Sequence, residues 1–310
     1  MERIRMLSNN EITLREGYTE YLLDCKARNL RDGTIRHYTD SFRQISKYID
    51  EKTFVSQITK SDFDKFVIDL RDNPNINDMS LYSYSRDFKT LLYFFMKKGF
   101  MPTYKISIPK SDKQPIETYT DKELSILLKK PNVNKCSFTE YKTWVMTNFL
   151  LSSGVRQNSL INIKIKDVDF EAEVVRIDTT KNRKPLIIPL NEDILAILKE
   201  YLKYRKGNDE DYLFCNAYGD KLVKSTLYHI FYEYNKRRGV EKTGIHRYRH
   251  TFAKKWVMLG GNVVSLQKIL GHSSLAITQN YLNLLVSDLK KDVDKTNILR
   301  EFKRNSIQMK

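Results

Sequence analysis

The sequence has few cysteines and no long apolar run, and these two shortages exclude several classes of protein. Its three cysteines, Cys25, Cys136 and Cys215, lie far apart and form no C-x-x-C pair. This pattern argues against a disulfide framework or a zinc site and suits a reducing compartment. No segment reaches the length of a membrane span, and the N-terminal residues lack the apolar core of a signal peptide. We therefore expect a soluble, cytoplasmic protein that does not bind a membrane.

Two signatures of energy-dependent and metal-dependent enzymes are also missing. The chain contains no Walker phosphate-binding loop, so we expect no use of ATP. Its histidines are not accompanied by paired carboxylates of metal-ligand character, which disfavours a two-metal nuclease. We expect neither a cofactor nor a metal ion.

Positive charge, by contrast, is abundant. The chain has 54 Lys and Arg residues against 38 Asp and Glu, a formal net charge of +16. Such an excess favours a polyanionic partner, although it says nothing about the fold. An anionic membrane surface fits less well, because no long basic amphipathic segment stands alone.

The length of 310 residues favours two domains. Residues 1–100 contain four segments with apolar side chains at helical spacing, and they predict a small helical bundle. Thr59 and Asp62 form a helix-capping pattern before the third segment, and Asn73-Pro74-Asn75 ends it. Residues 101–119 contain three prolines and no helical periodicity, so they predict an extended linker.

Residues 120–310 predict a second domain that combines helices with a small β-sheet. A capping box at Thr120–Glu123 opens it, and an apolar helix ends at Gly154. Clusters of β-branched residues predict three short strands at residues 167–170, 173–179 and 185–189. Two further helices are expected at residues 191–205 and 224–238. The predicted fold class is therefore mainly α with a small β-sheet.

The last third of the chain concentrates side chains that could grip and attack a phosphate. His246 and Arg249 are three residues apart, so a helix would project them from one face toward the oxygens of a phosphodiester. His272 follows Leu270-Gly271, and Tyr281, nine residues later, would supply the nucleophile. Arg156, upstream in Gly154-Val155-Arg156, completes the set. For any one of these residues, as for His250, a packing role is the commoner explanation.

This combination resembles the signature of the tyrosine recombinase (phage integrase) family. The family combines an arginine after a Gly-hydrophobic pair with a later H-x-x-R, an L-G-H and a tyrosine about nine residues further on. Here these stand as Gly154-Val155-Arg156, His246–Arg249, Leu270–His272 and Tyr281. The resemblance spans nearly the whole chain. It implies a core-binding domain in residues 1–100 and a mixed α/β catalytic domain in residues 120–310.

The resemblance also implies a chemistry for each signature residue. Tyr281 would form a 3′-phosphotyrosine, Arg156 and Arg249 would neutralise the phosphate, and His272 would donate a hydrogen bond to it. His246 would accept or position the tyrosine proton. The family carries a catalytic lysine on the hairpin before Pro189; counting back eight residues gives Lys181, with Lys184 as the alternative.

The implied partners are double-stranded DNA with specific recombination sites and further copies of the chain. In the family, a C-terminal helix, here about residues 286–306, docks on the neighbouring protomer of a tetramer; folding back onto the same chain is the alternative. The basic residues that we consider as DNA contacts are Lys26, Arg28, Arg31, Arg36, Arg86, Lys89, Arg183 and Lys184. Each alone is more often a solvated charge, but together they would give salt-dependent affinity.

One position departs from the family pattern. Ser159 stands where the family usually has glutamate, three residues after Arg156, and a hydroxyl holds a guanidinium more weakly than a carboxylate does. Two other functions stay open beside site-specific recombination and integration. One is a DNA relaxase similar to type IB topoisomerases, which would share the chemistry but act alone. The other, suggested by Ser159, is a DNA-binding regulator with a degenerate site.

Overall fold

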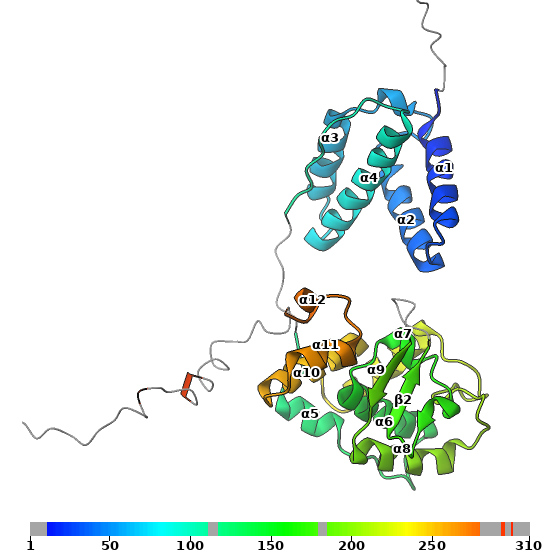
Figure 1. Cartoon of the computed structure of the whole chain (residues 1–310), viewed down its shortest axis with the longest axis vertical. Helices are drawn as coiled ribbons and strands as arrows, with labels where there is room; N and C mark the ends of the chain where they lie inside the picture. Colours follow the sequence, from blue (N-terminus) through cyan, green and yellow to red (C-terminus); the bar gives the residue numbers. More distant parts are fainter. Residues whose placement is uncertain (1–10, 111–116, 179–184, 280–292, 295–298, 300–310) are drawn as a thin grey trace, which may run out of the picture. The chain divides into compact units, whose positions relative to one another are not determined.

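The computed structural model describes residues 11–110, 117–178, 185–279, 293–294 and 299 of the chain, and it confirms the predicted fold class. Its contacts divide the chain into two compact units, Met1–Gln114 and Pro115–Lys310 (Figure 1). Helices dominate both units, and the described part of the second unit contains a three-stranded sheet.

The first unit is a bundle of the four predicted helices. These are α1 (Leu14–Ala27), α2 (Asp32–Ile45), α3 (Lys60–Arg71) and α4 (Asp78–Lys98), with a 3₁₀ turn at Val55–Gln57. The longest helix, α4, contacts each of the other three. The bundle therefore has its core along α4.

Capping side chains start these helices where the sequence indicated. Thr59 Oγ1 accepts the Asp62 amide of α3, and the Asp62 carboxylate accepts the Thr59 amide at 2.8 Å. The core is largely aromatic, since Tyr18 stacks on Phe42 with 3.8 Å between ring centroids. These contacts join α1 to α2.

The first part of the predicted extended linker, directly after α4, packs on the first unit. Met101 and Ile106 are 5% and 2% exposed, and Tyr104 Oη donates to the carbonyl of Ile58. Tyr104, Ile106 and Ile108 recur every second residue, as expected for an extended segment with one apolar face. A search for helical spacing overlooks this period. The boundary between the units, after Gln114, still falls inside the predicted linker.

The second unit begins with a capped helix and a buried one. Helix α5 (Asp121–Leu127) starts at Thr120, whose hydroxyl accepts the Glu123 amide at 3.2 Å. Helix α6 (Phe138–Ser153) is buried along most of its length and ends at Gly154 in the left-handed conformation. The short helix α7 (Gln157–Leu160) and a 3₁₀ turn at Ile165–Asp167 follow.

The three predicted strands form an antiparallel sheet in the order β1-β2-β3. They are β1 (Val168–Asp169), β2 (Val174–Ile177) and β3 (Leu186–Pro189). Val175 lies opposite Val168 on one side and Ile188 on the other, and all three side chains are buried. The sheet therefore covers the core with one face.

Five helices complete the described part of the second unit: α8 (Glu192–Arg205), α9 (Lys224–Arg237), α10 (Ile245–Met258), α11 (Val263–Leu270) and α12 (Leu275–Gln279). Helix α6 contacts α8, α9 and α10, which places it at the centre of the core. Phe252 of α10 and Leu266 and Leu270 of α11 are buried in one cluster, so these two helices pack together (Figure 1). Among the described residues, no helix is long and apolar enough to span a membrane.

Candidate active site

Two arginines from distant parts of the chain meet at one main-chain carbonyl. Arg156 follows the end of α6, and Arg249 lies in the second turn of α10. Arg156 Nη1 donates to the carbonyl oxygen of Leu270 at 2.9 Å, and Arg249 Nη2 donates to the same oxygen at 2.8 Å. The last residue of α11 thus holds the two predicted phosphate-binding guanidinium groups side by side.

Gly154 makes this approach of α6 to α10 possible. Its carbonyl oxygen accepts Arg249 Nη1 at 2.6 Å, and its φ is +61°. A Cβ atom at this position would lie 2.4 Å from Cδ1 of Phe252 and 2.9 Å from Cδ2 of Leu270. The Gly-hydrophobic-Arg motif therefore contains glycine because the backbone turns left-handed against an aromatic ring.

The two ring nitrogens of His272 both have polar contacts. Nε2 lies 2.9 Å from Arg249 Nη2, and Nδ1 lies 2.8 Å from Oγ1 of Thr278 on α12. His272 and Arg249 are 9% and 4% exposed, and Thr278 is fully buried. Gly271 ends α11 in the left-handed conformation, with φ +58°, and this turn directs the chain into the site.

His246 and His250 lie on α10, where desolvation and the charge of Arg249 lower the pKa of both side chains. His246 is exposed at the surface of α10. Desolvation by the protein atoms around the ring, followed by the charges of Arg249 and Arg156, lowers its pKa. Burial lowers the pKa of His272 to about 4, and Arg249 and Arg156 act in the same direction. Burial and His246, followed by Arg249, lower the pKa of His250 to about 4. Burial and the positive charge of the arginines thus together keep these imidazoles neutral at neutral pH.

Ser159 occupies the position where the family usually has glutamate. It lies on α7 and is 7% exposed. The guanidinium of Arg156 donates to two carbonyl oxygens, those of Leu270 at 2.9 Å and Gly271 at 3.4 Å. These bonds hold Arg156 without a carboxylate at residue 159.

Several predicted residues lie outside the described part of the chain. These are Lys181, Arg183, Lys184, Tyr281 and most of the proposed exchange helix at residues 286–306. Their roles remain predictions. Strand β2 ends at Ile177 and β3 begins at Leu186, so Lys181 belongs to the connection between them.

The six predicted DNA contacts of the first unit differ in what surrounds them. Lys26 and Arg36 are exposed on α1 and α2, and Arg31 is half-buried at the start of α2. Arg28 Nε pairs with Asp24 at 2.8 Å, and Lys89 Nζ lies over the Tyr93 ring at 5.2 Å. Arg28 is therefore partly neutralised within its own helix.

Arg86 belongs to a polar cluster that the sequence did not reveal. The buried carboxylate of Asp87 accepts from Arg86 at 3.0 Å, from His37 at 2.7 Å and from Ser41 at 2.6 Å. The side chains of Arg86 and His37 are 47% and 44% exposed, while that of Asp87 is 3% exposed. One buried acid thus orients two basic groups at the contact of α2 and α4. No motif marks such a pairing, because His37 and Asp87 are far apart in sequence.

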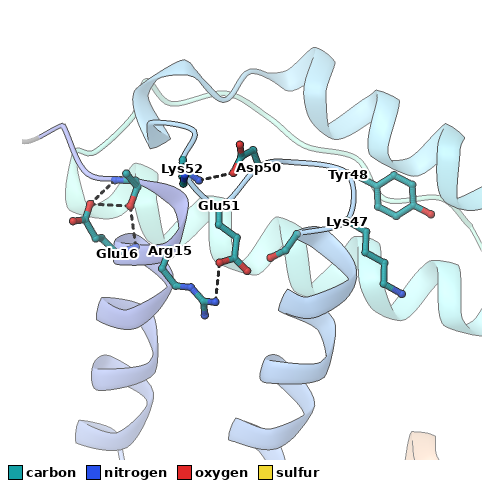
Figure 2. Close-up of a pocket in the computed structure, with 9 residues that line it drawn as sticks. Arg15, Glu16, Lys47, Tyr48, Asp50, Glu51 and Lys52 are labelled. Carbon is teal, nitrogen blue, oxygen red and sulfur yellow. Dashed lines mark hydrogen bonds and ion pairs between the residues drawn. The ribbon is translucent and has the colours of Figure 1, made fainter.

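A hollow of about 750 Å³ in the first unit contains none of the predicted site residues. It is lined by the start of α1 and by the loop that follows α2. Figure 2 shows that Arg15 reaches Glu51, at 2.7 Å, and that the main chain of Lys52 donates to Asp50. Glu16 caps the start of α1 through Thr13. Since these charged groups stabilise the ends of α1 and of the loop, we assign no chemistry to the hollow.

The described residues contain no group of three or more His, Cys, Asp or Glu side chains that could hold a metal ion. Sequence reasoning missed two parts of the site, the Leu270 carbonyl and the Thr278 hydroxyl. The carbonyl has no sequence signal because every residue has one. Thr278 lies between His272 and Tyr281, but its position alone does not distinguish it from a packing residue.

Comparison with known proteins identifies the family of the chain. A profile of the phage integrase family matches residues 117–287, more than half of the chain. The tyrosine recombinase XerA of Saccharolobus solfataricus is 27% identical over 267 residues, which cover 84% of this chain and 86% of that protein. XerC of Leptospira interrogans is 28% identical over 272 residues, which cover 85% and 87%.

Two solved structures share the fold. The Tn1549 transposon integrase in complex with transposon right end DNA matches with a TM-score of 0.72 and 20% identity, covering 92% of this chain and all of that one. A lambda integrase dimer bound to a COC′ core site matches with a TM-score of 0.71 and 17% identity, covering 98% and 82%. The profile match over more than half of the chain establishes that the chain belongs to the phage integrase family, that is, to the tyrosine recombinases.

Proposed function

We propose that this recombinase cleaves and rejoins double-stranded DNA at specific sites through a 3′-phosphotyrosine intermediate on Tyr281. The observation that carries the proposal is the shared carbonyl of Leu270, which holds Arg156 and Arg249 together beside His272. Three donors from separate elements in one positive field suit a tetrahedral anion, and the non-bridging oxygens of a phosphodiester fit it.

The reaction proceeds in two balanced steps. The phenol oxygen of Tyr281 attacks the scissile phosphorus, and the bond between phosphorus and the 5′ oxygen breaks. His246, neutral because its pKa is lowered, takes the phenol proton, and Lys181 protonates the leaving 5′ oxygen. In the second step a 5′-hydroxyl from the partner strand attacks the phosphotyrosine and gives its proton to Lys181, while the bond between phosphorus and Tyr281 breaks and His246 returns a proton to the phenol oxygen. Because the phosphodiester is exchanged and not hydrolysed, no ATP is needed. The guanidinium groups of Arg156 and Arg249 supply the positive charge that a metal ion would otherwise provide.

Arg156, Arg249 and His272 act on the phosphate throughout. The negative charge of the non-bridging oxygens must be countered while the phenolate approaches, and the two guanidinium groups supply that charge. Loss of either one is expected to cost about 3 kcal/mol of activation free energy, by analogy with the loss of an oxyanion donor. Removing Arg156 or Arg249 should therefore slow cleavage about a hundredfold.

The similarity to DNA-bound integrases and the positive charge of the chain support double-stranded DNA as the partner. Both solved structures named above are integrases bound to DNA, and this chain carries a net charge of +16. We further propose that the chain acts in the cytoplasm and that four copies assemble on paired sites through residues 286–306.

Covalent trapping tests the proposed chemistry. A duplex selected for binding from a random-sequence library would be nicked just 3′ of the scissile phosphate. The short fragment that carries the new 5′-hydroxyl then diffuses away, and the covalent adduct persists. The wild type should then accumulate a covalent protein–DNA species. Tyr281→Phe should bind the same duplex with similar affinity and form none. An adduct with Tyr281→Phe would show that another residue is the nucleophile, and wild-type binding without any adduct would indicate a regulator.

A second assay separates a recombinase from a relaxase, since both form the same adduct. Two selected sites placed on separate DNA molecules should yield joined products. Relaxation of a supercoiled plasmid without any joined product would contradict recombination. The two outcomes differ in whether copies on two sites exchange strands.

A further inference from the structure

The proposed mechanism requires His272 to donate a hydrogen bond to the phosphate. Its main chain is fixed, because its amide donates to the Gln267 carbonyl at 3.1 Å and its own carbonyl accepts Gln267 Nε2 at 3.3 Å. Its ring contacts Arg249 through Nε2 and Thr278 through Nδ1. The positions of the ring protons therefore decide what His272 can do.

The contacts define these positions in the DNA-free protein. A guanidinium group has only donors, so Nε2 of His272 must accept the hydrogen bond from Arg249. A neutral imidazole with an accepting Nε2 carries its proton on Nδ1. That proton then donates to Oγ1 of Thr278, 2.8 Å away.

This tautomer cannot donate to a phosphate. A hydrogen bond from Nε2 to a non-bridging oxygen requires the proton on Nε2, and Nδ1 then becomes an acceptor that needs a donor. A threonine hydroxyl can serve both states, since it accepts with its lone pairs and donates after a rotation about its C–O bond. Thr278 is fully buried, so a missing partner at Nδ1 would not simply be replaced by bulk water.

We propose that Thr278 is a positioning residue that sets the tautomer of His272, accepting from Nδ1 in the free protein and donating to Nδ1 when the scissile phosphate is bound. The exchange is neutral, because Nε2 gains one proton and Nδ1 loses one, both by exchange with solvent during transient local opening. Arg249 Nη2 then directs one N–H group to the phosphate instead of the ring and keeps its bond to the Leu270 carbonyl. The proposal rests on the proposed function, because it assumes that His272 contacts the phosphate. In the sequence Thr278 stands three residues before Tyr281.

Nitrogen NMR of the full chain tests this directly. With ¹⁵N-labelled histidine, the His272 signals are those that His272→Gln removes, and protonated and unprotonated ring nitrogens differ in chemical shift. The free protein should show Nδ1 protonated and Nε2 unprotonated. Tyr281→Phe bound to the selected duplex should show the reverse. A protonated Nε2 in the free protein, or the same tautomer in both states, would overturn the proposal, and neither result depends on cleavage.

Variants of Thr278 connect the tautomer to the rate. Thr278→Val should slow single-turnover cleavage about tenfold, the equivalent of one hydrogen bond, with unchanged DNA affinity. Thr278→Ser keeps the hydroxyl and should restore most of the rate. Thr251→Val removes another buried hydroxyl, on α10, which bonds the Tyr119 amide and the Arg247 carbonyl; it should leave the His272 signals unchanged.

These results are distinguishable from a failure of the proposed function. If the wild type forms no covalent adduct, the proposed function fails, whatever the variants do. If the wild type forms the adduct but Thr278→Val cleaves at the wild-type rate, or if Thr278→Ser is as slow as Thr278→Val, the role of Thr278 is refuted alone.

Discussion

Replacing Gly154 by alanine tests whether the close contact of α6 with α10 builds the arginine pair. Gly154 has a φ of +61°, and an added Cβ would lie 2.4 Å from Cδ1 and 2.8 Å from Cε1 of Phe252. The contacting atoms belong to a buried ring, with Phe252 8% exposed, so they cannot move aside freely. The substitution should push α10 away and with it Arg249, which is bonded to the Gly154 carbonyl.

The expected magnitude has two parts. A left-handed alanine costs about 1–2 kcal/mol relative to glycine. Overpacking of a buried site adds about 1–3 kcal/mol. Gly154→Ala should thus lower the free energy of unfolding of the second unit by about 2–5 kcal/mol, a range that sums these two costs.

A matched glycine separates the two parts. Gly239, also in the second unit, has a φ of +72° and no atom within 4 Å of its added Cβ. Gly239→Ala should therefore show only the conformational cost, and it should leave the rate of DNA cleavage close to that of the wild type. Urea unfolding, followed by tryptophan fluorescence, measures both variants, because Trp144 and Trp256 both lie in the second unit. Equal losses of stability in the two variants would refute the packing argument.

Three further perturbations test other parts of the account. Asp87→Asn leaves Arg86 and His37 without a buried anion and should lower the free energy of unfolding in urea titrations by about 1.5–3 kcal/mol. As a control, Asp40→Asn changes an exposed carboxylate and should alter this free energy by less than about 0.5 kcal/mol. On folding, the pKa of His250 and of His272 falls from 6.5 to about 4, so the unfolded chain binds more protons in this range. The free energy of unfolding should therefore decrease as the pH is lowered from 6.5 to about 4. His250→Gln should reduce the dependence of the unfolding free energy on pH, and an unchanged dependence would contradict the lowered pKa of His250. Lys181→Ala should cleave ordinary DNA slowly, and its cleavage rate should recover on a duplex with sulfur in place of the leaving 5′ oxygen, because a thiolate leaves without a proton. If only Lys184→Ala recovers its rate on this duplex, Lys184 is the proton donor.

The sequence predicted the elements that depend on local signals. Thr59 and Thr120 cap helices as expected, and Gly154 ends α6, because capping is decided within one turn. The three strands were found at their observed places, with ends one or two residues too long. The packing of residues 101–108 on the first unit was missed, since it depends on contacts with a distant core.

The candidate site was predictable in its residue types and not in its geometry. The spacing of the motifs and the family resemblance singled out Arg156, His246, Arg249 and His272, and the structure brings Arg156, Arg249 and His272 together. What joins them is the Leu270 carbonyl and the Thr278 hydroxyl, and no residue pattern encodes a shared acceptor. The buried Asp87 was missed for the same reason, because its partners on α2 come near it only in the folded bundle.

If Arg156 and Arg249 act by neutralising one scissile phosphate, a DNA duplex without that charge should no longer need them. A duplex with a methylphosphonate at the scissile position lacks the negative charge that the guanidinium groups counter. Arg249→Ala should cleave the ordinary phosphate about a hundredfold more slowly than the wild type and should regain most of that loss on the methylphosphonate. Equally slow cleavage of both duplexes by Arg249→Ala, with wild-type DNA affinity, would contradict the claim.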